Sequence, residues 1–248
     1  PLLPDPWSGV PGPEHPARTG IKFNSNGLPG YDRFVLSPAQ YALVLYAVLI
    51  ETGRMDEHGM KDYNQDGSSV EMIGAEHSPG MEVTTGSLGQ GISQASGIAM
   101  ALGLKGETGR VFVFLSDGEC QSGEFWEALQ AASFHKQDNL ILIVDRNGCQ
   151  CDGVMDPVMN IEPFDDRFRA FGCACVRITG HDPLALAAAL ETPHEGKPLA
   201  VVCDTDPCYQ MEFLRERHPK FHYIRFTQTG QWEDYRDRYE AMAKEAGK

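Results

Sequence analysis

Two polar side chains follow neighbouring segments that are predicted to be buried strands. Asp117 comes after the apolar run 111–115 and is followed by Gly118, whose missing Cβ lets a ligand approach the backbone closely. Asn147 holds the same place after the run 140–144, 30 residues further on. Carboxylate and amide oxygens suit Mg²⁺, which also takes part of its shell from substrate phosphates. The spacing therefore predicts a magnesium site that serves a diphosphate group.

Short apolar runs alternate with amphipathic segments from residue 111 to residue 203, and this alternation predicts the elements that position those side chains. The expected strands are 111–115, 140–144, 175–178 and 199–203, and the expected helices are 124–135, 165–171 and 183–190. This order is typical of an α/β fold, in which helices cover both faces of a parallel sheet. Ligands of such sheets bind at the carboxyl ends of the strands, where Asp117 and Asn147 are expected.

The chain before this alternation has two parts. Residues 1–33 are rich in Pro, Gly and Asn and lack apolar periodicity, which predicts an irregular N-terminal arm. Ser37 as a cap and Pro38 at the first helical position predict a helix that ends before Gly53. The sequence contains no internal repeat and no second composition regime. Residues 34–248 are therefore expected to form a single domain.

The composition excludes several classes of protein. The 248 residues include 21 Lys and Arg against 35 Asp and Glu, a net charge of −14, and no basic cluster that would bind nucleic acid. The longest apolar stretch, 41–50, is shorter than the roughly 20 residues of a membrane-spanning helix. Seven cysteines, an odd number mostly in or beside apolar runs, are typical of thiols in a reducing compartment. We expect a cytoplasmic location, since no signal sequence opens the chain.

The Asp-Gly pair and the later asparagine resemble the thiamine diphosphate fingerprint, and the surrounding segments resemble the transketolase family. These segments lie in the family's order over roughly residues 32–205. They include Pro79-Gly-Met-Glu-Val-Thr-Thr-Gly-Ser-Leu-Gly-Gln-Gly91, Ser116-Asp-Gly-Glu-Cys-Gln-Ser-Gly123, Trp126-Glu-Ala128 and Asp145-Arg-Asn-Gly148. The length resembles the amino-terminal half of a split transketolase, whose second half is a separate polypeptide.

This resemblance implies which residues hold thiamine diphosphate and its metal. Asp117 and the side chain of Asn147 would bind Mg²⁺, and the backbone carbonyl of Cys149 would be the third protein ligand. The backbone amide of Gly118 would contact the diphosphate. The cofactor would then supply the reactive carbanion, while the protein binds and orients it.

The resemblance also implies contacts away from the metal. The backbones of Gly86 and Leu88, in a glycine-rich turn, would hold the aminopyrimidine end of the cofactor. His222 resembles a histidine that contacts the diphosphate. Glu127 matches a glutamate of the family's carboxylate network, and His77 aligns loosely with a histidine that contacts substrate. Glu127 and His77 are therefore the candidate catalytic residues.

Several positions depart from the family pattern. Gln40 stands where the family has a histidine near the diphosphate, and an amide forms hydrogen bonds but cannot take up a proton at neutral pH. Ser122 replaces a glutamate of the carboxylate network, and the family's upstream Gly-His-Pro-Gly element is absent. These changes leave cofactor and metal binding as expected. They favour, as an alternative to sugar-phosphate transfer, a specialised carboligase that acts on a small ketoacid or an unphosphorylated ketose.

The resemblance finally implies a partner. In this family the glutamate that protonates the pyrimidine ring comes from another domain, so the chain is expected to be inactive alone. Its partner would be a second subunit with the pyrimidine-binding and C-terminal domains, in a heterotetramer with two copies of each. The predicted reaction transfers a ketol or acyl unit between small molecules. A non-catalytic scaffold that keeps the fold is the alternative of another class, although a scaffold has no need of metal ligands.

Overall fold

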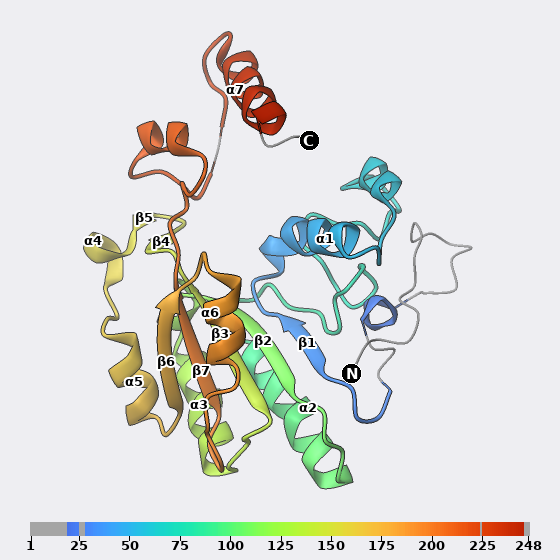
Figure 1. Ribbon diagram of the computed structural model, residues 1–248, viewed down its shortest axis with the longest axis vertical. Helices are drawn as coiled ribbons and strands as arrows, with labels where there is room; N and C mark the ends of the chain where they lie inside the picture. Colours follow the sequence, from blue (N-terminus) through green and yellow to red (C-terminus); the bar gives the residue numbers. More distant parts are fainter. Residues whose placement is uncertain (1–18, 25–27, 224, 246–248) are drawn as a thin grey trace.

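A parallel sheet forms the centre of the molecule (Figure 1). The computed structural model describes residues 19–24, 28–223 and 225–245. The five strands lie in the order β1-β2-β3-β7-β6, and every neighbouring pair is parallel. Their bounds are β1 Arg33–Leu36, β2 Val111–Ser116, β3 Leu140–Arg146, β7 Leu199–Asp204 and β6 Ala174–Thr179, and a small antiparallel pair consists of β4 Cys149–Gln150 and β5 Gly153–Val154.

Helices cover both faces of this sheet. On one face α2, α3 and α5 share a core with alternate strand residues such as Val113 and Leu142. On the other face α1 packs with Leu36, and α6 packs near Ile141 and Val201, because successive strand residues point to opposite sides. The helices are α1 Ala42–Glu51, α2 Gly91–Lys105, α3 Gly123–Phe134, α4 Met155–Met159, α5 Phe164–Ala170, α6 Pro183–Ala189 and α7 Gln231–Glu245. Short 3₁₀ helices span Gly20–Phe23, Ala39–Tyr41, Glu57–Asp62, Glu119–Gln121 and Glu212–Arg217.

The predicted α/β class is confirmed. Each strand and helix expected between residues 111 and 203 is present, with ends that differ by no more than one or two residues. Strand β1 is an addition, because its four residues are too few to show a periodic pattern. None of the helices within the described ranges is long and apolar enough to cross a membrane.

The helix predicted to begin at Pro38, with Ser37 as its cap, begins at Ala42, so this boundary was wrong. Pro38 has a ψ of 85°, which is not helical, and a 3₁₀ turn separates it from α1. The hydroxyl of Ser37 donates to the carboxylate of Glu119, so it does not cap the helix. A distant partner in the core therefore outweighs the local capping signal.

The two ends of the described chain differ in their packing. Most of the predicted arm lies outside the described residues, but Phe23 is fully buried in the cluster around α1. At the other end α7 stands apart from the sheet (Figure 1). Its Tyr235 packs against Phe213 of the preceding 3₁₀ helix, with 5.4 Å between ring centroids. The extent predicted for the single domain stays a prediction.

Candidate functional site

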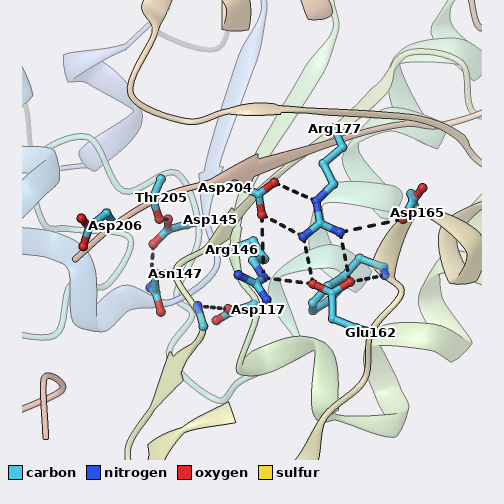
Figure 2. Close-up of polar contacts among 12 residues, drawn as sticks. Asp117, Asp145, Arg146, Asn147, Glu162, Asp165, Arg177, Asp204, Thr205 and Asp206 are labelled. Carbon is cyan, nitrogen blue, oxygen red and sulfur yellow. Dashed lines mark hydrogen bonds and ion pairs between the residues drawn. The ribbon is translucent and has the colours of Figure 1, made fainter. Parts of the chain in front are cut away.

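The carboxyl ends of β2 and β3 bring Asp117 and Asn147 to one place (Figure 2). Asp117 is fully buried, and its Oδ2 accepts a hydrogen bond of 2.7 Å from the N–H of Gly148. Its Oδ1 is also buried and has no hydrogen-bond partner among the residues that the structure describes. A buried carboxylate oxygen is costly unless a hydrogen bond or a cation compensates it. Asp117 Oδ1 therefore fits a site that a bound cation completes.

The ionisation of Asp117 agrees with a metal-binding role. Burial raises the pKa of its carboxyl to about 7, the nearby Asp145 carboxylate acts in the same direction, and the Gly148 N–H acts against both. A cation beside the carboxyl would favour the ionised form and lower this pKa. The group is thus poised to bind a metal ion and release a proton near neutral pH.

The amide of Asn147 is held at both ends. Its Nδ2 donates to Asp145 Oδ2 at 2.9 Å and lies 3.4 Å from the hydroxyl of Tyr41. Its Oδ1 accepts a hydrogen bond of 2.8 Å from the N–H of Cys149. Gly148 between them has a φ of +69°, a left-handed conformation that favours glycine. The loop after β3 therefore fixes both the place and the orientation of the amide.

The glycine-rich turn before α2 is fixed against the end of β1. Gln40 Nε2 donates to the carbonyl of Gly86 at 3.0 Å, and the Thr85 hydroxyl donates to the carbonyl of Leu36 at 2.6 Å. Gly86 has a φ of +108°, and a Cβ there would lie 3.3 Å from Ile73 Cγ2. Gln40 thus supports the turn that the resemblance assigns to the aminopyrimidine end.

Glu119 connects three segments of the site, and sequence reasoning missed it. Its side chain is buried, with 1% of the residue exposed. It accepts hydrogen bonds from the N–H groups of Gly89 at 3.1 Å and Ser116 at 3.3 Å, and one from the Ser37 hydroxyl. Burial raises the pKa of this carboxyl. A charged residue two positions after Asp117, directly beside a buried strand end, was the available signal.

A cavity of about 590 Å³ opens beside these strand ends. It brings together four residues that the sequence singled out, namely Gln40, Asn147, Cys149 and His222. The other lining residues are Tyr41, Met72, Ile73, Pro207, Phe221 and Tyr223. Neither lysine nor arginine is among the lining residues within the described ranges. The cavity is therefore mostly apolar, with a few polar groups at one end, as cofactor sites usually are.

The remaining predicted site residues lie around this cavity or away from it. Gly118 lies close to the loop after β3, since a Cβ there would be 3.2 Å from Gln150 Cβ. Leu88 is 46% exposed in the glycine-rich turn. His77 and Glu127 are not among the lining residues: His77 Nε2 lies 3.0 Å from a carboxylate oxygen of Glu71, and Glu127 is exposed on α3. The roles given to these four residues stay predictions.

Comparison with protein families identifies the domain. A family model described as "Transketolase, thiamine diphosphate binding domain" matches residues 21–210. The chain belongs to the transketolase family. The match spans the sheet, the glycine-rich turn and both strand ends that carry Asp117 and Asn147.

Curated bacterial relatives of this transketolase-family chain include separate subunits. It is 42% identical over 200 residues to a transketolase family protein of Sinorhizobium fredii, covering 79% of this chain and 71% of that protein. It is 33% identical over 182 residues to the 6-deoxy-6-sulfo-D-fructose transketolase subunit SqwG of a Clostridium species, covering 72% and 66%. It is 32% identical over 197 residues to an apulose-4-phosphate transketolase subunit of Actinobacillus succinogenes, covering 79% and 71%.

Solved transketolases share this fold. The enzyme of Campylobacter jejuni matches with a TM-score of 0.64 and 31% identity, over 71% of this chain and 29% of that one. The enzyme of Leishmania mexicana matches with a TM-score of 0.62 and 28% identity, over 79% and 33%. This chain therefore spans about a third or less of the length of these enzymes, and about two thirds of the length of the subunit-sized relatives.

Proposed function

We propose that this chain is the diphosphate-binding subunit of a two-component, thiamine diphosphate-dependent transketolase-like enzyme. The enzyme would transfer a ketol or acyl unit between small molecules by cleaving and forming a C–C bond. The observation that carries the proposal is the buried Oδ1 of Asp117 beside Asn147, which has no hydrogen-bond partner among the described residues, within a thiamine diphosphate-binding domain. Relatives of similar size that are named as subunits support the two-component arrangement.

Mg²⁺ fits the donor set at the strand ends. Asp117 Oδ1, the Asn147 side chain and the Cys149 carbonyl are oxygen ligands, which this ion prefers. Asn147 Oδ1 accepts one hydrogen bond and keeps a second lone pair for the metal. These three residues would hold the metal, and diphosphate oxygens and water would complete its shell.

The residues around the cavity would bind and orient the cofactor. Bound thiamine diphosphate supplies the carbanion chemistry, which no side chain of the protein provides. The Gly118 amide and His222 would contact the diphosphate, and the backbones of Gly86 and Leu88 would hold the aminopyrimidine end. Met72 and Ile73 give the cavity an apolar wall, which would limit the access of water once a partner covers these half-exposed side chains.

A second subunit would complete the active site. Apart from its last residue, Glu51, α1 is apolar on all sides, and helices of this kind are normally buried. Its exposed apolar residues, together with two on the following loop, form a surface that we call the α1 apolar face: Leu43, Val44, Val48, Met72 and Ile73. Since Met72 and Ile73 also line the cavity, a partner on this face would reach the cofactor. It would carry the pyrimidine-binding and C-terminal domains, in a heterotetramer with two copies of each chain. Glu127 and His77 lie outside the cavity lining, and the catalytic roles predicted for them are part of this proposal.

The charge of the chain bears on the substrate. Two relatives are named for a sulfonated and a phosphorylated substrate. Among the residues that the structure describes, the cavity lining includes neither lysine nor arginine, and a net charge of −14 repels anions at long range. An anionic substrate would therefore need cations from the partner. The second candidate, a carboligase for an unphosphorylated ketose or a ketoacid, is favoured by Gln40. Its amide cannot take up and release a proton at neutral pH, as the histidine of the family pattern can.

Titration calorimetry tests the proposal. Thiamine diphosphate with Mg²⁺ is titrated into this chain alone and into its mixture with the co-encoded second subunit. We expect a saturable heat of cofactor binding, and turnover only when both chains are present. The absence of both heat and turnover would favour the non-catalytic scaffold. Turnover of xylulose 5-phosphate with ribose 5-phosphate then distinguishes a sugar-phosphate transketolase from the specialised carboligase, because the carboligase would turn this pair over slowly.

The seven free thiols support the cytoplasmic location that we propose.

A further inference from the structure

We propose that Asp145 and Thr205 are positioning residues that orient the Asn147 amide, so that its oxygen and not its nitrogen faces the metal. The inference rests on the proposed function, because it takes Asn147 to be a ligand of Mg²⁺. The three side chains form a continuous line across the ends of β3 and β7 (Figure 2). Neither Asp145 nor Thr205 is among the residues to which the resemblance gave a role.

The first step concerns the two ends of an amide. Its oxygen accepts and its NH₂ group donates, but the two are similar in size, so only their neighbours decide which end points where. Asn147 Nδ2 lies 2.9 Å from Asp145 Oδ2, and an ionised carboxylate only accepts hydrogen bonds. A flipped amide would place two oxygens against each other there, and two donors against each other at the Cys149 N–H. The carboxylate of Asp145 therefore selects one orientation.

The second step concerns Thr205, the first residue after β7. Its hydroxyl donates to Asp145 Oδ1, so the two oxygens of Asp145 serve different partners. Its own N–H donates to the carbonyl of Arg146 at 3.0 Å, which anchors it to the neighbouring strand. β3 and β7 pair in parallel, with Asp145 opposite Cys203. A third strand end thus helps to hold the metal ligand without touching the metal.

Metal sites depend on such outer partners, whose loss typically weakens metal affinity by about 10- to 100-fold. Removing the Thr205 hydroxyl frees the Asp145 carboxylate to rotate away from Asn147. The amide would then spend part of its time with its NH₂ group towards the metal, where it cannot bind. We expect Thr205→Val to weaken Mg²⁺ binding about 10-fold, at the lower end of that range.

The test measures Mg²⁺ affinity of the chain with its partner subunit in excess thiamine diphosphate, by calorimetry and by the Mg²⁺-dependent rise in unfolding temperature. Thr205→Ser keeps the hydroxyl and is expected to bind like wild type. Thr179→Val is the matched control, because Thr179 is the exposed last residue of the neighbouring strand β6. Asp145→Asn can present a hydrogen-bond donor to Asn147 and should weaken Mg²⁺ binding as Thr205→Val does. It serves as the test variant if Thr205→Val does not fold.

The outcomes are distinct. Weaker binding by Thr205→Val, with Thr205→Ser and Thr179→Val near wild type, supports the inference. Wild-type affinity in Thr205→Val, or an equal loss in all three threonine variants, overturns it. If the wild-type protein itself binds no Mg²⁺, the proposed metal site is wrong and this inference falls with it. That failure is visible before any variant is made.

Discussion

Asp117 Oδ2 accepts a hydrogen bond of 2.7 Å from the N–H of Gly148, which ties the residue after β2 to the loop after β3. The N–H of Asp117 also donates to the carbonyl of Asp145, at 3.1 Å. The parallel pairing therefore continues one residue past the end of β2. The hydrogen bond from Gly148 commits Oδ2 to the protein and leaves Oδ1 for another ligand.

The ionisation of Asp117 predicts a pH-dependent stability in the absence of metal. Its pKa is raised to about 7 in the folded protein, against about 3.9 when unfolded, so the folded state binds more protons between these values. Stability from this group is therefore fully present below pH 4 and is lost as the pH rises to about 7. Between pH 5 and pH 8 we expect the free energy of unfolding of wild type to fall by about 2–3 kcal/mol relative to that of Asp117→Asn.

Urea unfolding with a chelator and without thiamine diphosphate measures this difference. Asp152→Asn, a change at an exposed aspartate in the turn between β4 and β5, is expected to follow wild type at each pH. Adding Mg²⁺ and thiamine diphosphate should stabilise wild type more at pH 8 than at pH 6, because the metal binds the ionised carboxylate. Parallel curves for wild type and Asp117→Asn would contradict the assigned pKa.

The central part of the fold was predictable because its signal is local. Strands such as 111–115 and 199–203 are short apolar runs between amphipathic helices. Strands that are apolar throughout are typical of a parallel sheet with both faces buried, so this pattern predicts the fold class. The start of α1 was not predictable in the same way. Ser37 carries a good capping signal, but its hydroxyl is used by Glu119, 82 residues further along the chain.

The site residues also differ in whether a local sequence signal predicts them. Asp117 and Asn147 were found because each directly follows a strand, so their spacing in the sequence reports their proximity in the sheet. Thr205 was not found, because one hydroxyl after a strand has no distinctive spacing, and only the β3–β7 pairing brings it to Asp145. Contacts that depend on which strands are neighbours are thus invisible until the strand order is known.

Glu119 predicts a strong dependence of stability on one carboxylate. Glu119→Ala would leave the N–H groups of Gly89 and Ser116 and the Ser37 hydroxyl without their acceptor, and a cavity beside them. Each buried polar group without a partner costs about 1–3 kcal/mol, so we expect a loss of about 3–5 kcal/mol. Glu119→Gln keeps one acceptor oxygen, and its loss of stability should be about half as large. Urea unfolding measures both, and an equal loss in the two variants would argue against the hydrogen bonds.

The glycine-rich turn predicts the effect of a single methyl group. Gly89 has a φ of +90°, and a Cβ there would lie 2.6 Å from Ser122 Oγ and 2.9 Å from Ser122 Cβ. Gly89→Ala combines backbone strain with this clash, and we expect it to destabilise the protein by about 2–4 kcal/mol. Gly97→Ala, within α2 and with open space around it, should instead stabilise by about 0.5–1 kcal/mol. Thermal unfolding of the two variants shifts in opposite directions if the geometry of the turn is right.

The α1 apolar face predicts which substitution separates the subunits. Leu43 lies in the first turn of α1 and is 47% exposed, so Leu43→Asp places a charge where the helix dipole tolerates it and the isolated chain should fold normally. In the complex that charge would be buried without a partner, and we expect affinity for the second subunit to fall at least about 10-fold. Leu104→Asp, at a residue of α2 that is 84% exposed and outside this face, is the control. Sedimentation velocity of the mixtures measures assembly, and normal assembly by Leu43→Asp would place the partner on another surface.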